Sequence, residues 1–278
     1  MKIVIRLSAI ISLALFMACS GQRTQPPQTT TSVTTTNTFD HKPFDKLLAM
    51  YVNADGLVDY PGLQKERGKL DAYLISLAAA KPQTFVSEAE RLAFWINGYN
   101  AFTLADVLDD VYGKLKSVND IKKVFFETKK HSVAGEQLTL NQIEQQGRNF
   151  KDPRIHFALV CASVSCPKLQ RFAFTGVGLE GQLGKVAEEF LADINRGMRY
   201  DPAHNEIYLS SIFKWYADDF TGSNTLVARV NAEASGGDLL EAAKKYLPAR
   251  PKEFLDEKKP NVKYIDYDWS LNAQWKKI

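Results

Sequence analysis

The stretch HFALVCASVSCPKL, residues 156–169, holds one of the chain's four histidines and two of its three cysteines. An imidazole and two thiols so close in sequence suit three kinds of chemistry: a Cys–His nucleophile, a metal site, or a disulfide beside a histidine. His156, Cys161 and Cys166 are therefore the first candidate site residues.

Metal binding is the least favoured of the three. Zinc sites commonly take four ligands from two closely spaced pairs, such as Cys-x2-Cys. Here four residues separate the two cysteines, and the other histidines, His41, His131 and His204, are scattered along the chain. We therefore predict no metal site, and no pattern in the sequence indicates a cofactor.

The nucleophile hypothesis depends on how residues 154–161 fold. RIHFALVC has the apolar character of a buried strand, and side chains alternate along a strand, so His156 and Cys161 would point to opposite faces. Only Cys166, after a turn over residues 162–165, would come back towards the histidine. The candidate catalytic pair is thus Cys166 as nucleophile and His156 as base.

A Cys161–Cys166 disulfide is the interpretation that we favour. A turn of small residues allows the Cα atoms to approach within the roughly 7 Å that a bridge requires. Disulfides persist in exported proteins. Free structural thiols and a reactive thiol remain open alternatives.

The N-terminal residues indicate export. Lys2 and Arg6 form a short basic region before an apolar run over residues 7–16. This run is too short to span a bilayer as a stable helix and is typical of a secretory signal. We predict a signal peptide over residues 1–18.

The end of that signal, Met17-Ala18-Cys19, resembles a bacterial lipobox, in which the cysteine is lipidated, although Phe16 departs from the usual leucine. Ser20 resembles the pattern of lipoproteins sent to the outer membrane. We predict that acyl chains such as palmitate on Cys19 anchor the protein at the periplasmic face of the outer membrane.

Residues 19–39 are rich in Thr, Gln, Pro and Ser and predict a disordered tether after the lipidated cysteine. Residues 40–278 have the mixed composition of one domain. The formal net charge is +3, and acidic and basic residues alternate without a basic stripe, so nucleic-acid binding is not expected.

The domain mixes helices and strands without regular βαβ spacing, which predicts an α+β fold: helices around a small, mostly antiparallel sheet, with one central buried helix. That helix follows Ser87, which forms a capping pattern with Glu90, and is apolar on nearly every side. A hairpin is expected at Ala134-Gly135. Further helices are predicted at 44–52, 62–79, 139–147, 179–196, 210–220 and 238–247, and further strands at 205–210 and 262–272.

Four polar residues are candidates for a pocket around His156. Asn97 and Asn100 share one face of the central helix and either bind neighbouring loop backbone or line the pocket. Glu144 and Arg154 are expected to pair, either as a structural ion pair or as a group that orients the histidine. In each case we favour the structural role.

Aromatic residues near the C-terminus offer a second kind of site. Trp215, Tyr216, Trp269 and Trp275 have the chemistry to stack on sugar rings, although aromatic residues at such spacing more often belong to a core.

The motifs DGLVDYPGL, FWINGYNAFTL, LTLNQIE, RIHFALVCASVSCPKL, SIFKWYADDF and YIDYDWSLN occur in the order found in the domain-of-unknown-function 547 family. The resemblance covers about residues 44–272. Because the function of this family is unknown, the resemblance implies little about chemistry. Bacterial members often look like exported proteins or lipoproteins. Gln145 stands where members often have a histidine. A papain- or transglutaminase-like relation would be distant, because the central helix carries no cysteine.

The sequence therefore predicts an exported, membrane-anchored lipoprotein with a periplasmic binding or envelope-associated module. Its ligand, a small molecule, a glycan or a protein, is not identified. The alternative is a thiol-dependent hydrolase or acyltransferase that uses Cys166 and His156.

Overall fold

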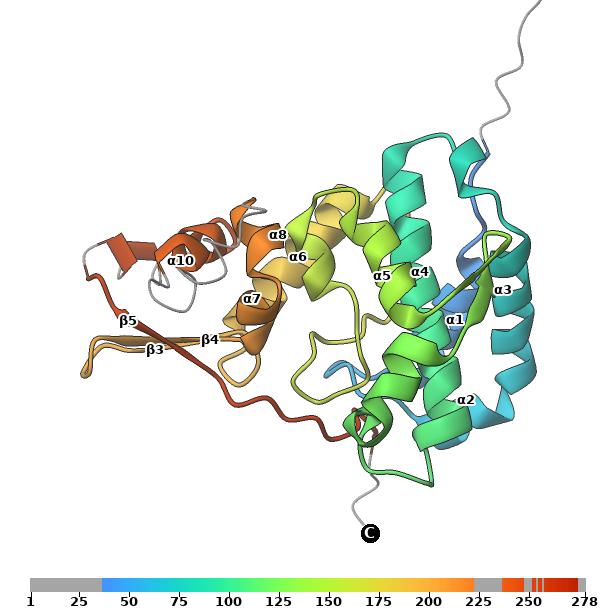
Figure 1. The fold of residues 1–278 in the computed structure, drawn as a ribbon, viewed down its shortest axis with the longest axis horizontal. Coiled ribbons are helices and arrows are strands. Elements are labelled where there is room, and N and C mark those ends of the chain that lie inside the picture. Colours follow the sequence, from blue (N-terminus) through green and yellow to red (C-terminus); the bar gives the residue numbers. More distant parts are fainter. Residues whose placement is uncertain (1–36, 223–236, 248–251, 254, 257, 275–278) are drawn as a thin grey trace, which may run out of the picture. The chain divides into compact units, whose positions relative to one another are not determined.

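The computed structural model describes residues 37–222, 237–247, 252–253, 255–256 and 258–274 (Figure 1). The predicted signal peptide, Cys19, most of the tether and Trp275 lie outside these residues. The described residues form an α+β domain, which confirms the predicted fold class. None of the described helices is both long enough and apolar enough to cross a membrane.

Helix α4, Glu88–Asp106, is the central helix. Ser87 begins it, because its hydroxyl accepts the N–H of Glu90. The predicted capping box is only half formed: the Glu90 carboxylate instead accepts the backbone N–H groups of Phe39 and Gly176. Residues 92–106 are all buried, as expected for a helix that is apolar on every side.

Other helices surround α4, with α3 (Arg67–Ala79) and α5 (Leu140–Arg148) packed against it (Figure 1). At the start of α5, Thr139 and Gln142 form the complete predicted capping box. The other described α-helices are α1 (Lys42–Tyr51), α2 (Tyr60–Lys65), α6 (Leu179–Ala192), α7 (Ser211–Trp215), α8 (Ala217–Thr221) and α10 (Gly237–Lys244).

Short 3-10 and π-helical turns connect these elements. The 3-10 turns are η1 (Pro82–Thr84), η3 (Val118–Ile121) and η5 (Pro153–Phe157). The π-helical turns are η2 (Val107–Val111), which directly continues α4, and η4 (Val124–Thr128).

The described strands form two small sheets rather than the single sheet that the sequence predicted. Strands β1 (His131–Val133) and β2 (Glu136–Leu138) form an antiparallel hairpin that turns at Ala134 and Gly135 as predicted. Both turn residues have positive φ, which matches the twist of the paired strands.

The second sheet has the order β3-β4-β5. Strands β3 (Met198–Asp201) and β4 (Glu206–Leu209) pair antiparallel, whereas β4 and β5 (Asn261–Tyr264) pair parallel. Strand β3 was not predicted, and β5 is shorter than the strand predicted over residues 262–272.

The strand predicted over residues 154–161 is wrong. Pro153 and Asp152 instead begin the 3-10 turn η5, with the Asp152 carboxylate accepting the N–H of Arg154. Irregular backbone follows, and Asn100 of α4 supplies the hydrogen bonds that a neighbouring strand would have made. The alternation argument that separated His156 from Cys161 therefore does not apply.

Candidate functional site

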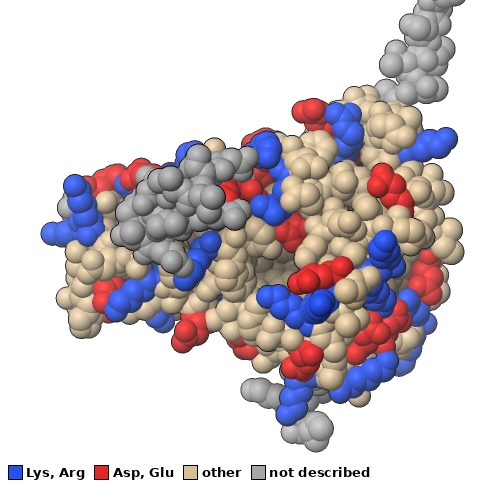
Figure 2. All heavy atoms as spheres, viewed as in Figure 1, with Lys and Arg blue, Asp and Glu red and all other residues tan. Residues whose placement is uncertain are grey.

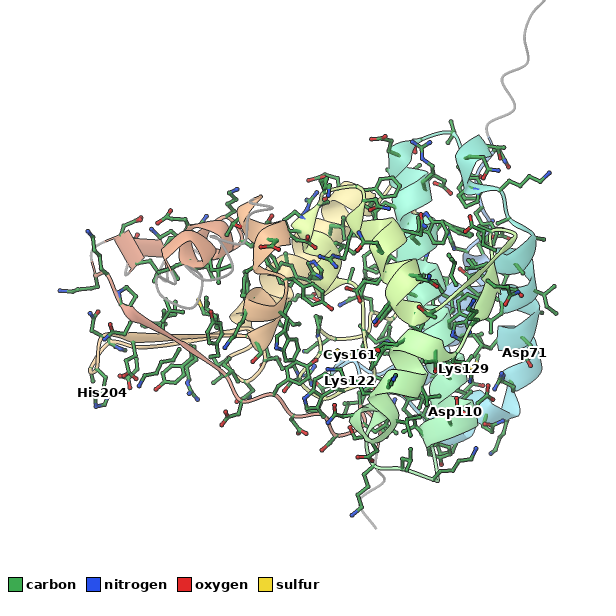
Figure 3. The ribbon with its side chains drawn as sticks, viewed as in Figure 1. Asp71, Asp110, Lys122, Lys129, Cys161 and His204 are labelled. Carbon is green, nitrogen blue, oxygen red and sulfur yellow. A yellow bond between two sulfur atoms is a disulfide. The ribbon has the colours of Figure 1, made fainter. Side chains whose placement is uncertain are left out.

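A cavity of about 390 Å³ lies among residues of α4, α5, η5, α7 and the C-terminal segment. Its aromatic lining consists of Tyr99, Phe126, Trp215, Tyr216, Tyr267 and Trp269. Its polar lining consists of Lys122, Glu127, Asn141, Glu144 and His156. The remaining lining residues are Leu159, Cys161, Cys166 and Ile212. Figure 3 labels Cys161 and Lys122, two of the residues that line it.

Three aromatic side chains form one wall of the cavity. The ring centroids of Trp215 and Tyr267 are 4.7 Å apart, and those of Tyr267 and Trp269 are 4.5 Å apart. Trp215 is 47% exposed, although it is large and apolar. Trp215 therefore presents stacking surface to solvent, whereas Tyr267 and Trp269 are partly buried against the core. The three residues are called the aromatic wall below.

His156 of η5 is buried and also lines the cavity. Its Nε2–H donates to Oδ2 of Asp219 at 2.7 Å. Its ring stacks on Tyr216, with 3.9 Å between the centroids and 26° between the planes. Two contacts from the α7–α8 segment thus fix the imidazole in one orientation.

Asp219 is bound by two side chains, His156 and Arg148. Arg148 of α5 binds it with two hydrogen bonds, Nε to Oδ2 at 2.6 Å and a terminal nitrogen to Oδ1 at 3.0 Å. Burial would raise the pKa of Asp219, but the hydrogen bonds and positive charge of His156 and Arg148 outweigh it and hold the pKa well below its ordinary value. Asp219 is therefore ionised and accepts the Nε2–H of His156.

The surroundings of Glu144 in α5 shift its pKa in the opposite direction to that of Asp219. Burial raises its pKa, although the charges of His156 and Arg148 and a hydrogen bond from Tyr216 work against the shift. Burial, together with the neighbouring Glu144 carboxylate, also raises the pKa of Tyr216, which keeps that phenol a hydrogen-bond donor. A cavity-lining carboxyl with a raised pKa, beside a fixed imidazole, is a feature of binding and catalytic sites.

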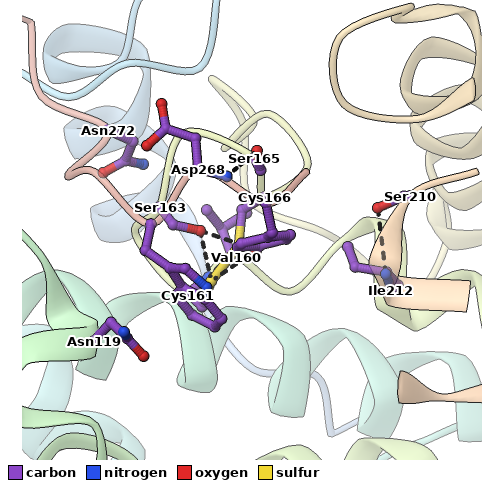
Figure 4. The surroundings of a disulfide bond; sticks show 12 residues. Asn119, Val160, Cys161, Ser163, Ser165, Cys166, Ser210, Ile212, Asp268 and Asn272 are labelled. Atoms are coloured by element: carbon purple, nitrogen blue, oxygen red, sulfur yellow. Dashed lines mark hydrogen bonds between the residues drawn. A yellow bond between two sulfur atoms is a disulfide. The ribbon is translucent and has the colours of Figure 1, made fainter. Parts of the chain in front are cut away.

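Cys161 and Cys166 stand at disulfide distance, with their Cα atoms 6.4 Å apart (Figure 4). Both members of the candidate pair Cys166 and His156 line the cavity. Each is bound to another partner, however: the sulfur to Cys161 and the imidazole to Asp219. In this disulfide-bonded arrangement neither sulfur is a thiolate nucleophile.

Asn97 and Asn100 lie outside the cavity lining. The Asn97 amide donates to the carbonyl of Phe174 and accepts its N–H. The Asn100 amide binds the carbonyl of Ala158 and the N–H of Val160 in the same way. Both residues therefore connect α4 to loop backbone, which is the role favoured from the sequence.

Arg154 does not pair with Glu144. Its guanidinium binds the carboxylates of Asp152 and Glu180 instead. Of the four predicted pocket residues, only Glu144 lines the cavity. No group of three or more His, Cys, Asp or Glu side chains within the described part of the chain is arranged to hold a metal ion.

Sequence reasoning missed Arg148, Asp219 and Tyr267 as site residues. Asp219 follows Trp215 and Tyr216 in the motif SIFKWYADDF, and Tyr267 precedes Trp269 in YIDYDWSLN, so both motifs contained the signal. The missing information was the contact with His156, which is 63 residues away from Asp219 in sequence.

One family model matches the part of the chain that contains α4, α5 and η5. Residues 83–191 match the model described as "Protein of unknown function, DUF547". The match supports the resemblance over this segment, which supplies Glu144, His156 and both cavity cysteines. No curated protein and no solved structure matches the chain.

Proposed function

We propose that this protein is an exported, lipid-anchored binding module whose cavity takes a glycan-like ligand. The observation that carries the proposal is the aromatic wall, with its exposed Trp215, in the same cavity lining as the carboxyl of Glu144. A cavity of about 390 Å³ has the size of small-molecule sites, which span about 300–1,000 Å³.

Sugar rings present an apolar C–H face and a rim of hydroxyl groups. Trp215 and Trp269 offer the flat apolar surface that such a face requires. Asn141 and Glu127 provide an amide and a carboxylate in the same lining, where they can bind hydroxyl groups. This combination supports a glycan better than a purely apolar ligand.

The closed sulfur pair does not favour the hydrolase alternative, because a thiolate nucleophile requires a free thiol. Charges of both signs are interspersed on the face shown in Figure 2, a pattern that offers no basic stripe for nucleic acid.

Binding is tested with the Cys19→Ala protein, which lacks the lipid site. Trp215 and Trp269 make intrinsic fluorescence a direct probe, and oligomers of glucose and of N-acetylglucosamine are the ligands to titrate. We expect a saturable change in fluorescence that Trp215→Ala weakens at least about tenfold, or about 1.4 kcal/mol. Tyr200→Ala, on β3 and outside the cavity lining, is the matched control.

Absence of a saturable fluorescence change with every oligomer up to about 10 mM would mean a binding free energy weaker than about −3 kcal/mol and would reject a glycan ligand. Equal loss in Trp215→Ala and Tyr200→Ala would reject the cavity as its site.

The anchor is tested separately in bacterial cells. The full-length chain should incorporate labelled palmitate and fractionate with the outer membrane, and Cys19→Ala should abolish both. Labelling that persists in Cys19→Ala, or a wild-type chain that is not labelled, would contradict lipidation at this residue.

A further inference from the structure

We propose that the Cys161–Cys166 disulfide is a thiol–disulfide exchange site that small dithiols reduce from the cavity. Cys161 Sγ is the sulfur that is attacked, and Cys166 is the leaving thiolate. This activity is independent of the glycan ligand proposed above, because it requires only the sulfur pair and its neighbours.

The first argument is access. Both cysteines line the cavity, but Cys161 is half-buried whereas Cys166 is only 4% exposed. Thiol–disulfide exchange needs a thiolate to approach one sulfur in line with the S–S bond. A reductant that enters the cavity therefore meets Cys161 Sγ first.

The second argument is the set of hydrogen-bond donors around Cys166 (Figure 4). The backbone N–H of Cys161 donates to Cys166 Sγ at 3.1 Å. The Tyr267 hydroxyl lies 3.2 Å from the same sulfur and 3.4 Å from Cys161 Sγ. A disulfide sulfur has no proton to give, so the phenol must be the donor.

A hydrogen bond from Ser163 orients the Tyr267 hydroxyl. The Ser163 hydroxyl lies 3.1 Å from Cys161 Sγ and 2.9 Å from the Tyr267 oxygen. When it donates to the Tyr267 oxygen, the phenol proton is left for the sulfurs. Burial raises the pKa of Tyr267 to about 12, so the phenol keeps its proton at neutral pH. Two donors thus converge on Cys166 Sγ, where negative charge develops when the S–S bond breaks.

The exchange balances with a dithiol as the reductant. One thiolate of the dithiol bonds to Cys161 Sγ as the S–S bond breaks, and the electron pair leaves on Cys166 Sγ. The second thiolate of the dithiol then attacks the mixed disulfide and releases the Cys161 thiolate. The dithiol is oxidised to its disulfide, and Cys161 and Cys166 are reduced and protonated from solvent.

The loop between the cysteines is held independently of the S–S bond. Val164 N–H donates to the carbonyl of Ser270 at 2.8 Å, and Ser165 N–H donates to that of Asp268 at 3.1 Å. On the other side of the turn, Asn272 N–H donates to the carbonyl of Ala162 at 3.0 Å. These contacts keep the two thiols close after reduction, so the bond can form again.

The test uses the folded Cys19→Ala protein at neutral pH with dithiothreitol as the probe. We expect second-order reduction while the far-ultraviolet circular dichroism stays native. Tyr267→Phe should slow reduction about tenfold, because it removes one donor to the leaving sulfur. Tyr208→Phe, which removes a hydroxyl bound to Glu206 outside the cavity lining, should leave the rate unchanged.

The attacked sulfur is identified with the monothiol 2-mercaptoethanol, an acid quench and peptide mass spectrometry. We expect the adduct on Cys161 and a free thiol on Cys166. An adduct mainly on Cys166, or reduction that proceeds only as the fold is lost, overturns the proposal. If Tyr267→Phe does not fold, Ser163→Ala replaces it, and an unchanged rate in that variant also overturns the proposal.

Discussion

The Nε2–H of His156 donates to Oδ2 of Asp219 across 2.7 Å, and Arg148 binds the same carboxylate. Because ionised Asp219 only accepts hydrogen bonds, it fixes a proton on Nε2 of the histidine. Tyr216 stacks on that imidazole and donates to Glu144. Residues from α5, η5 and the α7–α8 segment thereby form one connected polar network beside the cavity.

Asp219→Asn should destabilise the protein. The substitution removes the negative charge that Arg148 and His156 bind and leaves buried His156 without a strong acceptor. We expect a loss of about 1–3 kcal/mol in the free energy of unfolding at pH 7, measured by urea denaturation. Because the folded-state pKa of Asp219 is depressed, the difference from wild type should shrink as the pH falls below about 4.

The control for this prediction is a second aspartate–histidine pair. Asp201 binds His204 at 2.7 Å, but the His204 side chain is 72% exposed. Asp201→Asn should lower the free energy of unfolding much less than Asp219→Asn does, because exposed ion pairs contribute little. Equal losses of unfolding free energy in Asp201→Asn and Asp219→Asn would show that the buried network stabilises the fold no more than an exposed ion pair does.

Glu144→Gln should stabilise the protein at pH 8. Burial raises the pKa of Glu144, so the folded state is penalised for carrying its charge once the pH exceeds that pKa. An amide keeps an acceptor for Tyr216 without the charge. We expect a gain of about 0.5–2 kcal/mol, the usual size of a single stabilising substitution at a site retained for function.

The sign of this effect is specific to a raised carboxyl pKa. The gain of Glu144→Gln over wild type should decrease as the pH falls from 8 towards 4, because protonation of the wild-type carboxyl removes the buried charge. Urea unfolding at the two pH values measures it. A variant that is less stable than wild type at pH 8 would contradict the burial argument.

The parts of the fold that the sequence predicted depend on local patterns. The burial of α4 follows from apolar residues on all its sides, and the hairpin follows from Ala134-Gly135 between short strands. The cap of α5 needs only Thr139 and Gln142, which are three residues apart. Each of these features is set by neighbours within a few positions.

The predictions that were wrong or missing depend on distant contacts. Residues 154–161 have the apolar character of a strand, but their backbone partner is Asn100, 58 residues from Ala158. Arg154 pairs with Glu180 across 26 residues rather than with Glu144. No local pattern distinguishes a buried strand from irregular backbone that a distant amide satisfies.

His41 should make the protein less stable in mild acid. Burial lowers the pKa of His41 to about 4, although the negative charge of Asp40 acts in the other direction. Among the described residues, the Nε2 atom of His41 has no hydrogen-bond partner. The unfolded chain takes up the proton near pH 6.5. Stability should therefore fall by about 2–3 kcal/mol between pH 7 and pH 4 on this account.

His41→Asn provides the comparison, since asparagine keeps a hydrogen-bonding atom near the position of Nδ1, which binds Tyr73 at 2.7 Å. Urea unfolding at pH 7 and pH 4.5 should show a smaller acid-induced loss in the variant. Parallel losses in both proteins would assign the acid sensitivity to other groups.

The two asparagines of α4 allow a matched test of how the cavity wall is supported. Asn97→Ala and Asn100→Ala each leave one buried backbone carbonyl and one N–H without a partner, so each should cost about 2–4 kcal/mol in urea unfolding. Only Asn100 holds the backbone that leads into Cys161.

Asn100→Ala should therefore also speed the reduction of the disulfide by dithiothreitol several-fold, because the segment before Cys161 is less restrained. Asn97→Ala, whose contacts lie at Phe174, should leave the reduction rate at its wild-type value although it loses similar stability. If both variants accelerate reduction equally, the rate follows global stability rather than the local support of the cavity wall.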